Sequence, residues 1–460
     1  MMNIWRQLWN QLDLIFFGVY LWIIPFSWRK VLVPSVIPGH VGFNEYTDVS
    51  IYVSDIFLLL AVALFVIKNK KTILSTVIKI QMFHVEHFYL LIPFLLSLYA
   101  YLSVFWSDQR LLAFYSAFIF MEGPIIFYYL LGKICTQEDS ECSTWNIIQF
   151  IGIIFITSAL FQSIIGIIQF VQQSSIGLKF LNESILDTRI PGVAEILIQS
   201  IPVMRSYGTF LHPNIFAGYL FLSIILIFLS KRIQLFHVEQ LNLTLLLSIV
   251  LVAIVLSVSK SAILALIIAM LLTEMVFRVN NMHIVPRGTI IRIDKKMFHV
   301  EHFWVIIIAI LSVFGLYLLN NDNLTQSIQE RLDLIPNTEF FINEMSMFGF
   351  GIGQYVYNLS FIQLIDWKVQ PIHNVYIMIL IELGYIGITI YTYFLYKLLI
   401  IVPRGTIETY LWSISIGLVL IGMFDHYLFD IRSGQSIIWI SFGLLASIKH
   451  LTSKCKTYRI

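Results

Sequence analysis

Long runs of hydrophobic residues recur along the chain, separated by short segments that hold most of its charged and polar residues. Each run is close to the roughly 20 residues that cross a bilayer as a helix. The pattern therefore predicts an all-α polytopic membrane protein with about twelve transmembrane helices. The predicted spans are Leu12–Trp28, Ile51–Ile67, Phe88–Trp106, Leu111–Leu131, Ile147–Val171, Asn214–Leu229, Leu241–Val258, Ala262–Phe277, Phe303–Leu319, Asn374–Ile400, Tyr410–Met423 and Ser436–Ile448. Gly384 and Gly387 could break the tenth of these spans.

Composition excludes a soluble protein of this length. Hydrophobic residues make up 58% of the chain and charged residues only 12%, and the mean hydropathy is +0.84. Such a chain has too few polar residues to cover a water-exposed surface. Because no small-residue cleavage site follows the first apolar run, we expect Leu12–Trp28 to be a span and not a signal peptide.

Lysine and arginine gather in one set of loops, and this bias predicts the orientation of the chain. We expect a plasma (inner) membrane protein with both termini in the cytoplasm. The opposite, outer loops would be Arg29–Ser50, Gln172–Pro213, Asn320–His373 and Asp425–Gln435. Residues 1–460 are predicted to form one transmembrane domain. Its extracytoplasmic loop, residues 320–373, would hold a short amphipathic helix and a glycine-rich segment.

A repeated DNA word accounts for several otherwise suggestive segments. The palindrome TGTTCCACGTGGAACA encodes CSTWN, VPRGT or FHVEH/FHVEQ in its three reading frames. The chain contains these products at Met82–His87, Cys142–Asn146, Leu235–Gln240, Val285–Thr289, Met297–His302 and Val402–Thr406. We interpret them as tolerated insertions in cytosolic loops or at cytosolic helix ends, so their histidines are not candidates for a metal or catalytic site.

The remaining distinctive residues lie at predicted outer helix ends. The segment from Arg205 to Asn214 reads RSYGTFLHPN, and Ser259-Lys260-Ser261 joins two later spans. A glycine-rich stretch, Gly349-Phe-Gly-Ile-Gly353, is followed by His373-Asn-Val-Tyr376 and then by Glu382-Leu-Gly384. The three glycines follow no strand of a βαβ unit, so they predict a tight loop and not a nucleotide-binding site.

This ordered set, from Arg205 to Gly387, resembles the O-antigen ligase and O-antigen polymerase superfamily of polytopic membrane glycosyltransferases. The resemblance implies transfer of a glycan from a polyprenyl-diphosphate-linked oligosaccharide to a glycan or lipid acceptor at the outer face of the membrane. It also implies that no cofactor, metal or nucleotide sugar takes part. The family usually has an arginine where Lys260 stands.

Site residues follow from the same resemblance. Arg205 and Lys260 would bind the donor diphosphate, with Arg331 as a weaker candidate, and His373 would act at the acceptor. Pre-placed cations stabilise the charge that grows on a departing diphosphate, and an imidazole can accept a proton near neutral pH. Attack opposite the leaving group would invert the anomeric centre.

Simpler roles exist for each residue. Arg205 and Lys260 could be interfacial cations that extend toward lipid headgroups, and His373 could cap a helix. His212, which precedes a proline at a helix start, favours a structural role. Asn214 and Asn374 are expected to cap helices. Glu382 lies inside an apolar span, where a carboxylate is costly, so we expect it to be paired or functional. Asp425, His426, Asp430 and Arg432 lie in the last outer loop, where they could line the site or be solvated charges.

A polymerase and a ligase would share this donor chemistry. Of these two functions, we prefer polymerisation of a surface polysaccharide. A transporter or flippase of lipid-linked glycans is the alternative, but it would need internal repeats and interrupted helices, and no repeat is evident apart from the palindrome products. A scaffold without catalytic activity is a third interpretation. The expected partners are the lipid-linked donor, the acceptor and membrane lipids, and no nucleic acid.

Overall fold

The computed structural model describes residues 2–35, 37, 44–79, 88–135, 141–198, 200–232, 240–282, 329, 331–363, 369–403 and 405–457. By their contacts the residues form two compact units. Unit 1 comprises Met1–Phe155, Asp333–Ile400 and Gly422–Ile460, and unit 2 comprises Ile156–Leu332 and Ile401–Ile421.

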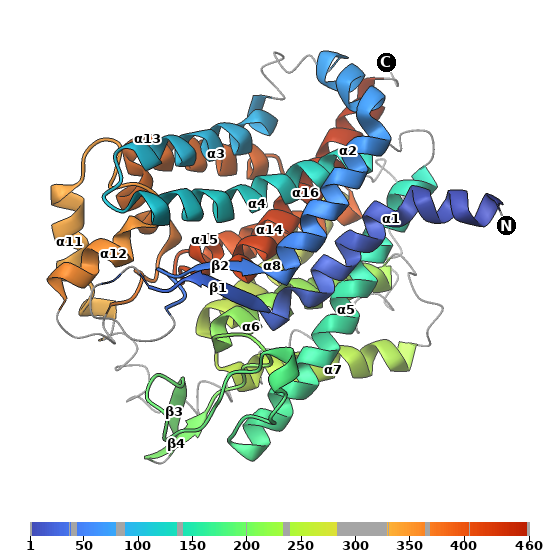
Figure 1. Cartoon of the computed structure of the whole chain (residues 1–460). Helices are drawn as coiled ribbons and strands as arrows, with labels where there is room; N and C mark the ends of the chain where they lie inside the picture. The colour runs from blue at the N-terminus through green and yellow to red at the C-terminus, as the bar shows by residue number, and fades with distance from the viewer. Residues whose placement is uncertain are drawn as a thin grey trace. The chain divides into compact units, whose positions relative to one another are not determined.

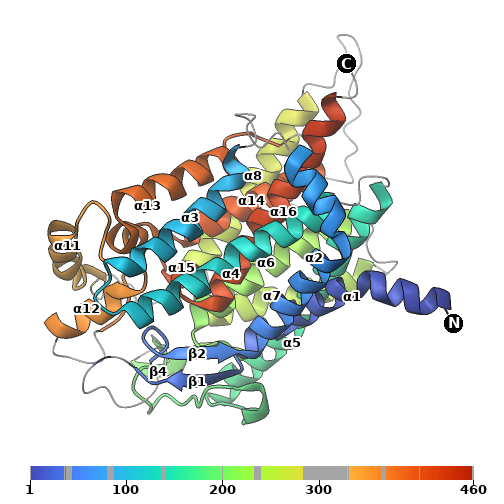
Figure 2. The same cartoon turned by 45° about the horizontal axis from the view of Figure 1, so that its top comes forward.

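Most of the described residues are helical (Figures 1 and 2). The long helices are α1 (Met2–Ile23), α2 (Val53–Lys79), α3 (Ile92–Leu102), α4 (Arg110–Cys135), α5 (Glu141–Gln172), α6 (Pro213–Arg232), α7 (Gln240–Ser257), α8 (Lys260–Met282), α13 (Val375–Leu399), α14 (Thr406–Ile421) and α16 (Arg432–Thr457). Each predicted span in the described residues overlaps one of these helices, with ends that differ by several residues. The ninth, Phe303–Leu319, lies outside the described residues.

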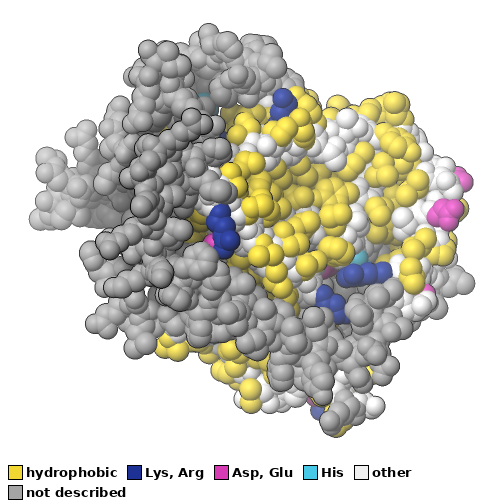
Figure 3. Space-filling view, turned by 180° about the vertical axis from the view of Figure 1, so that it is seen from behind, with side chains coloured by type: hydrophobic (Ala, Val, Ile, Leu, Met, Phe, Trp, Pro, Cys, Tyr) yellow, Lys and Arg dark blue, Asp and Glu magenta, His cyan; other side chains and the backbone are white. Residues whose placement is uncertain are grey.

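Among the described residues, four helical segments are long and apolar enough to cross a membrane: Arg110–Cys135, Ile147–Gln172, Lys260–Val279 and Val375–Leu399. The face drawn in Figure 3 carries a broad area of hydrophobic side chains, with few charged residues among those described. Such a surface is expected where helices meet lipid. The chain is therefore a membrane protein, while the count of twelve spans stays a prediction.

Two of the predicted outer loops contain small β-hairpins, which a hydropathy pattern does not predict. In unit 1, β1 (Arg29–Val33) pairs antiparallel with β2 (Val49–Tyr52). In unit 2, β3 (Glu195–Ile198) pairs antiparallel with β4 (Ile201–Met204). These strands are only four or five residues long, so they give no periodic signal strong enough to stand apart from a loop.

In unit 1, α4 packs against α3 on one side and α16 on another (Figures 1 and 2). Small residues allow the close approach to α16. A Cβ added at Gly123 would lie 2.1 Å from the Trp439 ring, and one at Gly443 would lie 3.2 Å from the Cα of Phe127. Glycines at helix contacts let membrane helices approach closely, and close packing substitutes there for the hydrophobic effect.

Close packing of helices at a glycine also occurs in unit 2, where α6, α7, α8 and α14 pack together. A Cβ at Gly417 of α14 would lie 2.3 Å from the ring of Phe221 on α6. Between α8 and α14, the Thr273 hydroxyl donates to Ser413 Oγ at 2.8 Å.

The predicted outer loop before α13 contains α11 (Ile335–Glu344) and α12 (Gln354–Ile362). They pack through Phe341, whose ring centroid lies 5.0 Å from that of Tyr355 and 5.5 Å from that of Phe350. An amphipathic helix was expected in this loop, and α11 is a short helix within it, with Pro336 in its first turn, where proline is well tolerated.

Two of the palindrome products lie at least partly in described residues. Cys142–Asn146 forms the first turns of α5, and Val402–Thr406 connects α13 to α14, with Arg404 outside the described residues. Both positions match the expected loops or helix ends. The other four products lie outside the described residues, apart from Gln240, and the cytosolic placement of all six stays a prediction.

Candidate functional site

His373 lies in unit 1, just before α13, within a cluster of two imidazoles and two carboxylates. Its Nδ1 is 3.6 Å from Asp425 Oδ1, and its side chain is 28% exposed. Its ring centroid is 5.3 Å from that of His426, whose Nδ1 contacts Asp430 Oδ2 at 2.8 Å. Because part of its side chain is exposed, a substrate can reach His373. The Asp425 carboxylate faces the Nδ1 atom of the ring.

The two imidazoles of the cluster have different surroundings. The His426 side chain is buried and paired with Asp430, on the four-residue helix α15 (Tyr427–Asp430). Burial opposes its charged form, but the Asp430 carboxylate outweighs burial and raises the pKa of His426. His373 Nδ1, by contrast, has no hydrogen-bond partner among the described residues. With its side chain 28% exposed, against 10% for His426, His373 is the more accessible of the two imidazoles.

The same residues are of types that bind transition metals. One ligand atom each from His373, Asp425 and His426 can be chosen so that all lie within 4.8 Å of one another. Two histidines and one carboxylate suit zinc or iron. A metal site was not expected from the sequence.

Asn374 begins α13 as its N-cap. Its Oδ1 accepts hydrogen bonds from the backbone N–H groups of Tyr376 and Ile377 at 2.9 and 3.0 Å, as a capping side chain does. Its Nδ2 donates to the Met423 carbonyl at 3.0 Å. Asn374 therefore ties the start of α13, next to His373, to the segment that carries Asp425.

Glu382 holds the glycine-rich loop against α13. Its carboxylate, 3% exposed, accepts from the backbone N–H of Gly353 at 2.8 Å and of Tyr355 at 3.3 Å. The carboxylate thus caps the start of α12 and satisfies donors that would otherwise be unpaired. The expectation that a carboxylate inside an apolar span is paired agrees with this arrangement.

Two glycines are needed where the loop meets the helix. Gly349 and Gly384 both have positive φ, 77° and 66°. A Cβ at Gly349 would lie 2.5 Å from the Glu382 carbonyl oxygen, and one at Gly384 would lie 2.2 Å from the Met347 carbonyl oxygen. Gly384 also breaks the helical geometry of α13, as the sequence suggested it could. Because the opposing atoms are backbone, neither position can admit a side chain without moving the loop.

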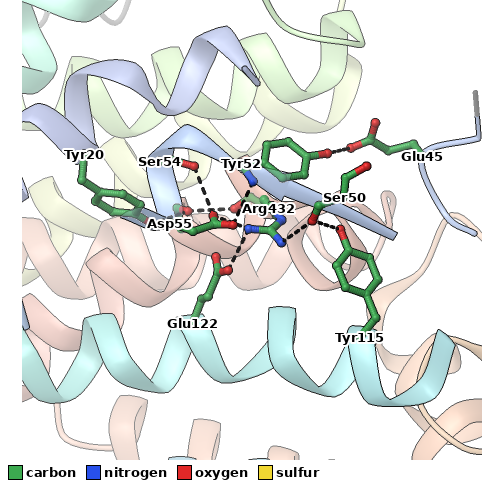
Figure 4. Close-up of polar contacts among 10 residues, drawn as sticks. Tyr20, Glu45, Ser50, Tyr52, Ser54, Asp55, Tyr115, Glu122 and Arg432 are labelled. Atoms are coloured by element: carbon green, nitrogen blue, oxygen red, sulfur yellow. Dashed lines mark hydrogen bonds and ion pairs between the residues drawn. The ribbon is translucent and has the colours of Figure 1, made fainter. Parts of the chain in front are cut away.

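Arg432 centres a buried ion cluster in unit 1 (Figure 4). Its Nη1 pairs with Asp55 and, at 2.8 Å, with Glu122 Oε1, and its guanidinium lies 4.2 Å from the centroid of the Tyr52 ring. These residues come from α16, α2, α4 and β2. Sequence reasoning placed Arg432 only among the charges of the last outer loop. Asp55 and Glu122 lie inside predicted spans, and carboxylates there were the signal for such a cluster.

A small cavity of about 50 Å³ lies in unit 1. Glu45, Tyr46, Glu382 and Asp430 are among its lining residues. Tyr46 contacts the His426 ring, with 5.7 Å between centroids. Burial raises the pKa of Tyr46 well above its ordinary value, and nearby carboxylates add to the rise. The cavity therefore adjoins the histidine cluster, because Asp430 lines the cavity and also pairs with His426.

In unit 2, Arg205 is bound to the turn that carries Lys260. Its Nε donates to the Ser257 carbonyl at 2.7 Å and its Nη2 to Asn214 Oδ1 at 2.6 Å. The backbone N–H of Ser206 donates to the Leu256 carbonyl at 3.0 Å. Lys260 starts α8 three residues after Ser257. The structure thus brings together Arg205 and the Lys260 turn, which are far apart in the sequence.

The other predicted residues of unit 2 have separate roles. His212 Nδ1 accepts from the backbone N–H of Asn214 at 3.2 Å, so His212 helps to cap α6, in line with the structural role expected for it. Asn214 contacts Arg205 through its side chain. Arg331 is exposed, and its assignment to the diphosphate stays a prediction. Arg205, Lys260 and Arg331 belong to unit 2, and His373 belongs to unit 1.

Comparison with known proteins adds one finding. Residues 243–392 match the family model described as O-antigen ligase. No curated protein and no solved structure matches the chain. The matched region begins in α7 and includes Lys260, the glycine-rich loop, His373 and Glu382, so it contains most of the residues on which the resemblance was based.

Proposed function

Because residues 243–392 match the O-antigen ligase family and confirm that resemblance, we propose that this protein is a membrane glycosyltransferase. It transfers glycan from a polyprenyl-diphosphate-linked donor to an acceptor hydroxyl at the outer face of the plasma membrane. Polymerisation of a surface polysaccharide is preferred to ligation. Both termini lie in the cytoplasm.

The observation that carries this proposal is the attachment of Arg205 to the turn before Lys260. Two cations from distant parts of the sequence are held at one end of α8. Arginine offers a fixed fork of donors and lysine a point charge, a combination suited to a diphosphate. Charges fixed in advance stabilise the departing diphosphate more than mobile ones, since they need no reorganisation during the reaction.

His373 supplies the other half of the reaction. The acceptor hydroxyl gives its proton to the imidazole as its oxygen forms a bond to the anomeric carbon, and the bond from that carbon to the diphosphate oxygen breaks. Asp425, facing Nδ1 at 3.6 Å, stabilises the imidazolium that forms. Attack from the side opposite the diphosphate inverts the anomeric centre. Arg331 is a further phosphate contact in this scheme.

Reconstitution in lipid vesicles tests the proposal against its alternative, a flippase. Purified protein is supplied with radiolabelled polyprenyl-diphosphate-linked oligosaccharide, and both longer or acceptor-linked glycan and transbilayer movement of the donor are measured. We expect glycan transfer without nucleotide sugar and no acceleration of donor movement. Movement without transfer would establish the flippase instead.

Replacing Arg205 with alanine is expected to lower kcat by about 10²-fold, the scale seen when one pre-placed donor to a developing charge is removed. Arg205→Lys should retain part of the activity, because it keeps the charge but not the fork of donors. Steady-state kinetics with the lipid-linked donor measure both.

Arg189→Ala is the matched control. Arg189 lies on the same stretch between α5 and α6, with its side chain 88% exposed and paired with Asp187, and it should leave the kinetics unchanged. Equal losses in the Arg189 and Arg205 variants would contradict a diphosphate-binding role for Arg205.

A further inference from the structure

A second, larger hollow in unit 1 lies beside the glycine-rich loop. It has a volume of about 350 Å³, within the roughly 300–1,000 Å³ range of small-molecule sites. One wall comes from the segment after α3, with Trp106 and Asp108. The other comes from the end of α11 and the segment after it, with Glu344, Ser346 and Phe348. None of these residues belongs to the site described above.

Two exposed aromatic side chains, Trp106 and Phe348, line this hollow. The Trp106 ring centroid lies 5.7 Å from that of Phe348 and 5.9 Å from that of Tyr99 on α3, with each pair of rings tilted. The Tyr99 hydroxyl donates to the Phe348 carbonyl at 3.3 Å and so links α3 to the second wall. Trp106 is 38% and Phe348 48% exposed. The face of an exposed aromatic ring suits a ligand with a flat apolar face.

Acidic and hydroxyl side chains share the hollow with these rings. Asp108 and Glu344 are exposed, and their carboxylates can each accept hydrogen bonds from two neighbouring hydroxyl groups. A lipid chain is a poor occupant, because it would desolvate the two carboxylates without giving them a partner. A pyranose ring has both an apolar face for the aromatic rings and vicinal hydroxyls for the carboxylates.

The glycine-rich loop borders this hollow and the smaller cavity near the histidine cluster. Gly349 and Phe350 line the hollow, and Phe350 N–H donates to the Ile381 carbonyl of α13 at 3.0 Å. Farther along the same loop, Ile352 and Gly353 line the cavity that contains Asp430. One short loop therefore contributes residues both to the Trp106 hollow and to the cavity near the histidine cluster.

We propose that the Trp106 hollow is a glycan-binding subsite, which holds one sugar residue of the glycan substrate away from the reacting bond. The inference rests on the proposed glycosyltransferase function and deepens it. Occupation of the subsite would increase affinity for a longer glycan without touching the reacting atoms. A residue of this kind changes KM more than kcat.

Kinetics of single variants test the subsite. Trp106→Ala and Phe348→Ala are expected to raise KM about tenfold for one of the two glycan substrates, donor or acceptor, with kcat nearly unchanged, because one aromatic contact is worth about that factor. The substrate whose KM rises identifies the glycan that occupies the hollow. Asp108→Asn and Glu344→Gln should act in the same direction, and Trp106→Phe should retain most of the affinity.

Phe105→Ala is the matched control. Phe105 precedes Trp106 and is 76% exposed, but it is not among the residues lining the hollow. If the aromatic residues served only as membrane anchors, Phe105→Ala and Trp106→Ala would have equal effects, and the subsite would be overturned. An unchanged KM in Trp106→Ala would overturn it as well.

A direct binding measurement tests the subsite independently of the proposed glycan transfer. The probe is the free oligosaccharide released by mild acid from the host's own lipid-linked glycan, titrated calorimetrically into the detergent-solubilised full chain. We expect binding to wild type that weakens about tenfold in Trp106→Ala, whether or not the protein transfers glycan. Equal binding to both, with both variants monodisperse on gel filtration, would refute the subsite and leave the proposed function standing.

Discussion

Replacing His373 with alanine is expected to lower the rate of glycan transfer by about 10²- to 10⁴-fold, the contribution usual for a general base. The reason is geometric. The His373 side chain is 28% exposed and has a carboxylate at 3.6 Å from Nδ1, so it can take a proton from an acceptor and be stabilised once charged. The measurement is kcat of purified protein with lipid-linked donor and a saturating acceptor.

The His373→Gln variant tests whether His373 acts as a base or has only a structural role. Glutamine is close in size and keeps hydrogen-bonding capacity but cannot accept a proton at neutral pH. We expect it to be as inactive as alanine while folding normally and binding donor with unchanged affinity. Restored transfer in His373→Gln would show that the imidazole only caps or orients the chain at this point.

Replacing Arg432 with glutamine is expected to destabilise the folded protein by about 3–5 kcal/mol, the cost of removing one partner from a buried ion pair. The guanidinium balances Asp55 and Glu122 in a site where its own side chain is only 8% exposed. Without it, two carboxylates from α2 and α4 face each other with no cation between them. Thermal unfolding in detergent, followed by tryptophan fluorescence, measures the loss.

A second substitution identifies the cause of that loss. In the Arg432→Gln background, Glu122→Gln removes one of the two stranded charges and should recover part of the stability. Arg278→Gln is the control, because Arg278 and Glu274 form a partly exposed pair one turn apart on α8. Such pairs contribute about 0.3–0.5 kcal/mol. An unfolding midpoint for Arg432→Gln equal to that of Arg278→Gln would contradict the role assigned to the cluster.

Several features could be predicted from the chain alone. Helix positions followed from hydropathy, because lipid requires each crossing segment to be apolar along its own length. The helix start at Asn374 and the break at Gly384 followed from local preferences of asparagine and glycine. The family resemblance followed from the order of short motifs, and the family match over residues 243–392 confirms it.

Other features depended on contacts that no local pattern records. Nothing in the sequence near Arg205 shows that its guanidinium binds the Ser257 carbonyl, 52 positions away. Taken one at a time, Asp55, Glu122 and Arg432 are charged residues in or near predicted spans, where an unpaired charge is costly. Their pairing is evident only in the structure, where α2, α4 and α16 meet. The role of Glu382 in capping α12 likewise required the loop to fold back on α13.

By itself, therefore, the sequence determined that this chain is a helical membrane protein, where most of its helices lie, and which family it resembles. These are properties of single segments, since whether a segment can cross a bilayer depends on the hydropathy of that segment. The tertiary structure decided which charges are paired, which imidazole is accessible and which aromatic rings line a hollow. Those properties belong to pairs of distant residues, and their energies depend on burial and distance, which exist only once the helices have packed.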